Sequence, residues 1–289
     1  TTEIYTLSLH DALPIFTGTN WFKVPESIKV VFKGKPSKYV TGKDLILEII
    51  RMIGVDGALY KTLEFTGDTI AYLTMDDRFA LCNMAIEAGA KSGIVAYDEI
   101  TEEFLKARTL RDTPKIHYSD ADATYCQVLE IDVASLEPVV AYPFLPENGH
   151  SISEAVRDHI RVDQVFIGSC TNGRLSDLRV AAEILEGKRV APHVRMIVTP
   201  GTQKILREAT KLGYIDTLVD AGAVISNPTC GACLGGYMGI LGDDEVCIST
   251  TNRNFVGRMG SRSSKVYLSN SAVAAASAIS GYITNPADL

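Results

Sequence analysis

The sequence has no apolar run long enough to cross a membrane and no excess of positive charge. Its longest weakly polar stretch, from Ser271 to Ile283, is rich in alanine and serine and falls short of the ~20 apolar residues that a membrane-spanning helix needs. The 28 lysines and arginines are outnumbered by 35 aspartates and glutamates, which gives a net charge of −7. Because nonspecific nucleic-acid binding depends on clustered positive charge, we expect neither a membrane protein nor a nucleic-acid-binding protein.

Cysteine is also scarce, with six in 289 residues, which is too few for a disulfide framework. We therefore expect a soluble protein of the cytoplasm. Three cysteines have apolar sequence neighbours and are expected to be small buried side chains: Cys82, Cys126 and Cys247. The other three lie among Gly, Asn, Thr and Pro, a composition typical of loops, and are candidates for a site: Cys170, Cys230 and Cys233.

The first residues differ in character from the rest of the chain. The segment TTEIYTLSLHDALPI resembles translated sequencing-adapter read-through, and it has neither the basic start nor the cleavage site of a signal peptide. We therefore expect residues 1–16 to be a non-native, disordered leader. His10 and Asp11 form an acid-base pair by type, but on this interpretation they carry no function.

The chain length predicts two domains at roughly 150 residues each. The charged segment from Thr101 to Pro114 ends in Asp-Thr-Pro and indicates a helix followed by a linker. The predicted domains are therefore residues 17–108 and residues 109–289. In the first, periodicity predicts two strands, 27–34 and one within 58–68, and two helices, Gly42 to Ile53 and Arg78 to Ala88.

In the second domain, strand and helix patterns alternate. Strands are predicted at 162–168, 194–200 and 245–250, with a further strand inside 218–226. Helices are predicted at 175–187, 202–213 and 270–280. This alternation indicates an α/β fold with parallel-rich sheets flanked by helices and ligand-binding loops at the carboxyl ends of the strands. Cys170 follows such a strand end.

The cysteine spacing alone leaves several chemistries open. Cys170 and the Cys230-x-x-Cys233 pair supply three thiolates. Structural zinc usually takes four ligands, and His193 is the only histidine nearby in sequence. A dithiol redox pair is a second possibility, and iron–sulfur clusters normally use four cysteines. A cubane held by three thiolates would leave one iron open to water or substrate, as a Lewis-acid catalyst requires.

Four motifs in order carry a family resemblance: GSCTNGRLSDLR, TPGTQK, NPTCGACLGG and NRNFVGRMGS. Together with LCNMAIEAGAKSGIVAYDE upstream, they resemble the aconitase superfamily, in its branch of 3-isopropylmalate dehydratase and homoaconitase large subunits. The resemblance extends from Thr17 to Leu289. It implies two aconitase-type domains, the second and third of a large subunit.

The resemblance implies a hydro-lyase with a 4Fe-4S cluster that isomerises a hydroxy acid by removing and re-adding water. Cys170, Cys230 and Cys233 would be the cluster ligands, with Arg253 and Arg258 near the substrate carboxylates. The expected reaction is that of 3-isopropylmalate dehydratase in leucine biosynthesis. The alternatives are homoaconitase, in the lysine or coenzyme B pathway, and a non-catalytic metal-binding fragment.

Polar residues of two further motifs complete the expected site. Asn83 and Glu87 match a motif of the family whose polar residues reach the cluster side, which the resemblance implies here as well. They lie four residues apart and so share one helical face. Asn172 and Asn252 are expected to donate or accept hydrogen bonds next to the cluster sulfurs or the substrate.

The same resemblance implies groups that this sequence does not contain. Family large subunits carry a further upstream domain, and a separate small subunit supplies the catalytic base and another substrate-binding arginine. We therefore expect a truncated chain with little activity alone, a small-subunit partner, and a small hydroxy-dicarboxylate or hydroxy-tricarboxylate substrate.

Overall fold

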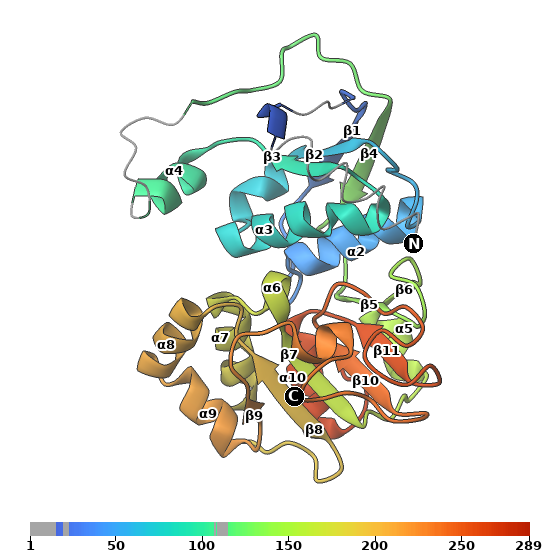
Figure 1. Ribbon diagram of the computed structural model, residues 1–289, viewed down its shortest axis with the longest axis vertical. Coiled ribbons are helices and arrows are strands. Elements are labelled where there is room, and N and C mark those ends of the chain that lie inside the picture. The colour runs from blue at the N-terminus through green and yellow to red at the C-terminus, as the bar shows by residue number, and fades with distance from the viewer. Residues whose placement is uncertain (1–15, 20–22, 107, 109–114) are drawn as a thin grey trace.

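The computed structural model describes residues 16–19, 23–106, 108 and 115–289 (Figure 1). The leader predicted over residues 1–16, with His10 and Asp11, lies outside the described residues except for Phe16. Most of the predicted linker before Pro114 lies outside them as well.

A four-stranded, all-parallel sheet with the order β3-β2-β1-β4 begins the fold (Figure 1). Its strands are β1 Ser27–Lys33, β2 Thr62–Gly67, β3 Ser92–Val95 and β4 Gln127–Asp132. Its helices are α2 Gly42–Ile53, α3 Met75–Met84 and α4 Glu99–Lys106, with 3₁₀ turns at Asp68–Tyr72 and Ala85–Ala88. We call this sheet with its helices the first unit.

Burial alternates along β1, so that Ile28, Val30 and Phe32 point into the core while the residues between them do not. The helices α2 and α3 cover that buried face and lie between the first sheet and the rest of the chain (Figure 1). Helix α2 has the bounds that the sequence predicted, and Thr41 and Asp44 form a capping box at its start.

A seven-stranded sheet with the order β6-β5-β11-β10-β7-β8-β9 forms the core of the second unit. The central strands are parallel, whereas β5 runs antiparallel to both β11 and β6. The strands are β5 Val139–Ala141, β6 Gly149–Ser151, β7 Gln164–Gly168, β8 Arg195–Thr199, β9 Val224–Ile225, β10 Val246–Ser249 and β11 Lys265–Leu268.

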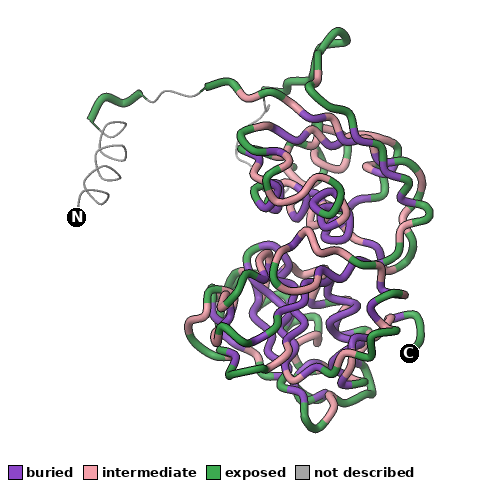
Figure 2. The backbone as a smooth tube through the Cα atoms, turned by 90° about the vertical axis from the view of Figure 1, so that its right-hand side faces the viewer, coloured by how far each residue is buried: buried purple, intermediate pink, exposed green. Residues whose placement is uncertain are grey.

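Helices flank this second sheet, and their bounds are α5 Ile152–Arg157, α6 Ser169–Asn172, α7 Leu175–Leu185, α8 Gln203–Lys211, α9 Tyr214–Asp220 and α10 Ser271–Ser280. The α10 helix is built of small residues, which lets it pack closely against α7 and β7. In Figure 2 the buried backbone runs through the interior of both units, and exposed segments form their outer edges. The α/β fold with parallel-rich sheets is confirmed.

Sheet membership differs from the domain boundary predicted at residue 108. Strand β4 pairs with β1, with Ile28 opposite Gln127 and Phe32 opposite Ile131, so the first unit extends to the end of β4. The chain enters the second sheet at Val139. The charged segment from Thr101 includes most of α4 and stands between β3 and β4 in the chain.

The two units share buried contacts. One continuous cluster of buried apolar side chains includes Ile28 and Phe65 of the first sheet together with Phe166 and Leu268 of the second. Helix α2 contacts β5 and β6 of the second sheet as well as α3. No helix among the described residues is long and apolar enough to span a membrane.

Candidate active site

A sharp turn at the carboxyl end of β7 presents Cys170. Gly168 has φ +147°, and a Cβ there would lie 2.1 Å from the carbonyl oxygen of Thr199. Ser169 follows with φ +83°, an uncommon value for a residue other than glycine. The turn leaves Cys170 exposed on the short helix α6, where the sequence placed a ligand-carrying loop.

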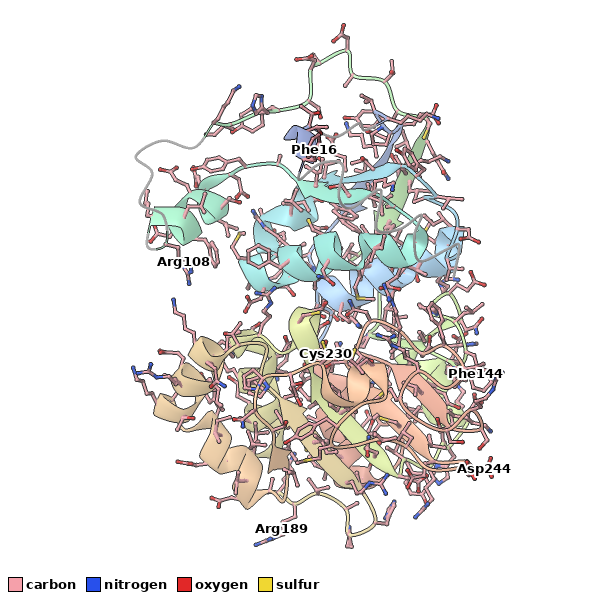
Figure 3. The ribbon with its side chains drawn as sticks, in the orientation of Figure 1. Phe16, Arg108, Phe144, Arg189, Cys230 and Asp244 are labelled. Carbon is pink, nitrogen blue, oxygen red and sulfur yellow. The ribbon has the colours of Figure 1, made fainter. Side chains whose placement is uncertain are left out.

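Cys230 and Cys233 lie on a single turn elsewhere in the second unit. The backbone N–H of Cys233 donates to the carbonyl of Cys230 at 3.1 Å. Cys230 is exposed and Cys233 is half-buried, and both have free thiols. Figure 3 shows Cys230 at the top of the second unit, beneath the helices of the first.

Arg258 influences the Cys233 thiol. Burial raises the pKa of this thiol, while the positive charge of Arg258 and a hydrogen bond from it act in the opposite direction. The negative charge of Cys170 raises the same pKa, so these two cysteines influence each other although they are distant in sequence. Arg258 therefore acts on the pKa of Cys233, while its role in a site stays a prediction.

Asn83 of α3 connects the first unit to two loops of the second. Its Oδ1 accepts a hydrogen bond from Thr171 Oγ1 at 2.5 Å and another from Asn252 Nδ2 at 2.9 Å. Thr171 Oγ1 in turn lies 3.8 Å from Cys170 Sγ. The CNM motif, the CTN motif and the NRN motif thus meet at one amide oxygen.

Glu87 pairs with Arg253 across the same boundary. Arg253 Nε lies 2.9 Å from Glu87 Oε1 and 3.0 Å from Oε2, and the carboxylate side chain is only 3% exposed. Burial raises the pKa of Glu87, and the charge of Arg253 is the largest opposing effect. The helix predicted through Ala88 ends at Met84, so Glu87 reaches this position from the 3₁₀ turn that follows.

Several buried polar atoms near the cysteines have no hydrogen-bond partner within the described residues, namely Ser169 Oγ, Asn172 Oδ1, Asn252 Oδ1 and Arg258 Nε. Buried polar groups are nearly always paired, so such a group of atoms beside three thiols indicates a place for a polar ligand. Asn172 itself donates through Nδ2 to Asp177 Oδ1 at 3.3 Å.

A single-ion metal site is not formed here. Within the part of the chain that the structure describes, no three His, Cys, Asp or Glu side chains are arranged to hold one metal ion. His193 is excluded as a fourth ligand, because it precedes the amino end of β8 whereas Cys170 follows the carboxyl end of the parallel neighbour β7. Ligands of a multi-iron cluster bind different iron atoms, so three separate thiols with unpaired polar atoms around them fit that donor chemistry better.

The sequence did not single out Lys43 or Asp177. Lys43 is fully buried and donates to the carbonyls of Thr251 at 2.6 Å and Thr250 at 3.1 Å. Burial lowers the pKa of Lys43 to about 8, against the opposing charge of Glu87. Burial likewise raises the pKa of Asp177 to about 6. Only the fold could reveal them, because a lysine or an aspartate in the first turn of a helix is usually solvated.

Cys126 and Cys82 differ from the expectation that they are buried. Cys126 is exposed and Cys82 is half-buried, whereas Cys247 is buried as predicted. Cys126 directly precedes the edge strand β4, which pairs only with β1, so apolar neighbours in sequence do not enclose it.

Known proteins resemble this chain over most of its length. A family model described as "Aconitase family (aconitate hydratase)" matches residues 12–281. The 3-isopropylmalate dehydratase large subunit of Aliarcobacter butzleri is 81% identical over 280 residues, which are 95% of this chain and 66% of that protein. The proteins of the same name from Sulfurimonas denitrificans and Wolinella succinogenes are 78% and 71% identical, covering 95% and 96% of this chain and 66% of their own lengths.

The chain thus spans 66% of the length of these curated relatives. Among solved structures, the holo-form of Thermococcus kodakaraensis aconitase X matches 80% of this chain and 49% of its own, with a TM-score of 0.44 and 14% identity.

Proposed function

The chain belongs to the aconitase family, and from that premise we propose that it is part of the large subunit of a hydro-lyase that dehydrates and rehydrates 3-isopropylmalate. Relatives at 71–81% identity carry the name 3-isopropylmalate dehydratase large subunit, which supports this substrate over homocitrate. The same name supports a small subunit as the partner.

Three cysteines would hold the cofactor, a 4Fe-4S cluster: Cys170, Cys230 and Cys233. When bound by three thiolates, such a cluster supplies an open iron position with Lewis-acid character. Burial raises the pKa of Cys233, and the positive charge of Arg258 opposes that effect in favour of the thiolate form that a ligand requires. The unpaired Asn172 Oδ1 and Asn252 Oδ1 are acceptors for a ligand hydroxyl or a bound water.

Arg253 is the proposed carboxylate-binding residue of this chain. Glu87 engages its Nε, and no hydrogen bond to another described residue occupies the two terminal nitrogens of the guanidinium. A guanidinium fixed at Nε presents its remaining N–H groups in a planar fork that suits a substrate carboxylate. Glu87 thereby orients the arginine, and Arg258 is the second cation on this face.

The observation that carries the proposal is the double hydrogen bond at Asn83 Oδ1. It joins the segment of Cys170 to the segment of Arg253 from the opposite unit, with donor distances of 2.5 and 2.9 Å. Three motifs that are far apart in the sequence therefore meet at one polar atom, which supports a shared site at this boundary.

Anaerobic reconstitution of the purified chain with iron and sulfide tests cluster binding. We expect on the order of four irons and four sulfides per chain with visible charge-transfer absorption. The variants C170S, C230S and C233S should each lose most of this loading. C126S is the matched control, because Cys126 is an exposed free thiol in the other unit. Equal loading of all four variants would overturn the assignment.

A turnover assay tests the substrate. The large subunit at full length, together with the small subunit, should dehydrate 3-isopropylmalate in preference to homocitrate. The 289-residue chain alone should show no turnover even when loaded, because the base that removes the proton is proposed to lie on the partner. Iron–sulfide loading without turnover by the full assembly would favour a non-catalytic metal-binding role.

A further inference from the structure

Lys43 is a buried cation whose hydrogen-bond partners carry no charge. It is the second residue of α2, its side chain is 0% exposed, and it lies in the first unit. Its Nζ crosses to the second unit and donates to the carbonyl oxygens of Thr250 and Thr251, at 3.1 and 2.6 Å. Within the described residues it makes no ion pair. A buried ammonium without a paired carboxylate is costly, so its retention needs a reason.

Asp44, the carboxylate next to Lys43 in the chain, forms its hydrogen bonds with other groups. Asp44 accepts hydrogen bonds from Asn270 Nδ2 at 2.9 and 3.1 Å, from the backbone N–H of Val139 at 2.9 Å, and from Thr41. Asp44 therefore anchors the start of α2 to the second unit and leaves Lys43 free to bind the carbonyls after β10.

The turn that Lys43 binds carries site residues at both of its ends. The Thr250 hydroxyl accepts from the backbone N–H of Gly168 at 2.9 Å and lies 3.1 Å from the Gly168 carbonyl oxygen, so it contacts the turn that presents Cys170. In the other direction the chain continues directly from Thr251 into Asn252 and Arg253. Displacement of this turn would therefore disturb a cysteine and an arginine together.

Four acidic side chains act electrostatically on the Lys43 ammonium. Glu87, Asp177, Cys233 and Asp44 all act on it as negative groups. Asp44 and Asp177 are held by their own donors, and Glu87 is paired with Arg253.

We infer that Lys43 is a positioning residue of the site: its ammonium holds the Thr250–Arg253 turn against α2, and through Thr250 it steadies the Gly168 turn that presents Cys170 to the cofactor. The first half of this inference concerns the chain without any cofactor. The second half rests on the proposed function. Neither half requires Lys43 to touch the substrate.

Hydrogen exchange of the cofactor-free chain tests the first half. In K43M, peptides covering residues 249–258 should exchange at least about 10-fold faster than in the wild type, while peptides from β1 and α10 remain unchanged. K33M is the matched control, because Lys33 forms an exposed pair with Glu130 and should leave all peptides unchanged. Unaltered exchange of residues 249–258 in K43M would overturn the positioning role.

If K43M does not fold, two further variants test the same positioning role. K43R retains the charge and donors and should exchange within about threefold of the wild type in residues 249–258, whereas K43Q should resemble K43M. Equal behaviour of K43R and K43Q would show that the cation has no role in holding the turn.

Cluster retention tests the second half. After reconstitution, iron release to a chelator should be at least about 10-fold faster from K43Q than from the wild type or K33M, with K43R between them. Equal release rates would show that holding this turn does not affect how firmly the cofactor is bound. If the wild type takes up no iron and sulfide, the proposed function fails, and the exchange data still decide whether Lys43 positions the turn.

Discussion

Arg253 and Glu87 meet across the boundary between the two units, with the guanidinium Nε 2.9 and 3.0 Å from the two carboxylate oxygens. The residues are 166 positions apart in the chain, so only the assembled fold creates the pair. Because the carboxylate is buried and the arginine is partly exposed, the pair fixes the arginine and leaves its outer edge accessible. This is the arrangement expected of a residue that receives an anionic substrate.

We expect E87Q to lower kcat/KM of the full-length enzyme by about 10- to 100-fold, since a hydrogen bond between charged groups contributes about 1.5–3 kcal/mol. The substitution keeps the shape of the side chain but releases the arginine from its fixed orientation. Steady-state kinetics on the large subunit with its small subunit is the measurement. E183Q, which breaks the exposed Arg179–Glu183 pair on α7, should leave kcat/KM unchanged. A normal kcat/KM for E87Q would contradict the orienting role.

Alkylation should separate five of the six cysteines into two groups. Burial raises the pKa of Cys247 to about 12 and that of Cys82 to about 11, so their thiolates are scarce at pH 8. Iodoacetamide should therefore modify them at least about 100-fold more slowly than the exposed Cys126, Cys170 and Cys230.

Peptide mass spectrometry over a time course measures these alkylation rates. Loading with iron and sulfide should protect Cys170 and Cys230 while Cys126 remains reactive. Protection of Cys126 to the same degree would point to aggregation instead of cluster binding.

Acid should weaken the link between α3 and α4. Hydrogen bonds from the buried Arg78 guanidinium lower the pKa of Asp98 from its ordinary value to about 2. A carboxylate with a lowered pKa stabilises the fold above its ordinary pKa near 4, and that stabilisation is lost as the pH falls through about 2.

D98N should accordingly lower the free energy of unfolding by at least about 1 kcal/mol at pH 7, a figure already reduced for the partial exposure of Asp98. The difference from the wild type should shrink toward pH 2. Urea unfolding at both pH values is the measurement. E130Q, in the exposed Lys33–Glu130 pair, serves as the control and should change little at either pH. A D98N deficit that is independent of pH would exclude the ionised pair as its cause.

Gly168 should tolerate no side chain. Since a Cβ would lie 2.1 Å from the Thr199 carbonyl oxygen and φ is +147°, G168A should cost about 3 kcal/mol or more in unfolding free energy. It should also reduce cluster loading, because the turn presents Cys170. G187A, also at positive φ but with no atom within 4 Å of the added Cβ, should cost only about 1 kcal/mol. Equal costs for the two variants would show that the Thr199 contact is not limiting.

Helices and strands whose pattern lies within one continuous segment could be predicted from the sequence alone. Helix α2 was predicted at its observed bounds because its apolar period and the glycine that follows it are contained within one segment. Strand β7 and helix α7 were found for the same reason. Strands β5 and β6 have only three residues each, too few to show a period, and they were missed.

Features that depend on contacts between residues far apart in the chain could not be predicted from local sequence patterns. The pairing of β4 with β1, which brings residues after the predicted boundary at 108 into the first sheet, is not reported by any local composition, and the boundary itself stays a prediction. Lys43 is buried by carbonyl groups more than 200 residues away, so its environment is invisible in the sequence around it. The roles of the candidate site residues stay predictions, although the fold brings Asn83 to Asn252 and Glu87 to Arg253.

Helix α2 packs against residues of both units. Its apolar side chains pack in a buried cluster that also contains residues of both sheets, and its first turn is bound to the second unit through Lys43 and Asp44. Neither sheet can therefore lose its order while the other keeps a complete core. The protein should melt in one cooperative transition, and cutting the connection between β4 and β5 should not release two halves that fold separately.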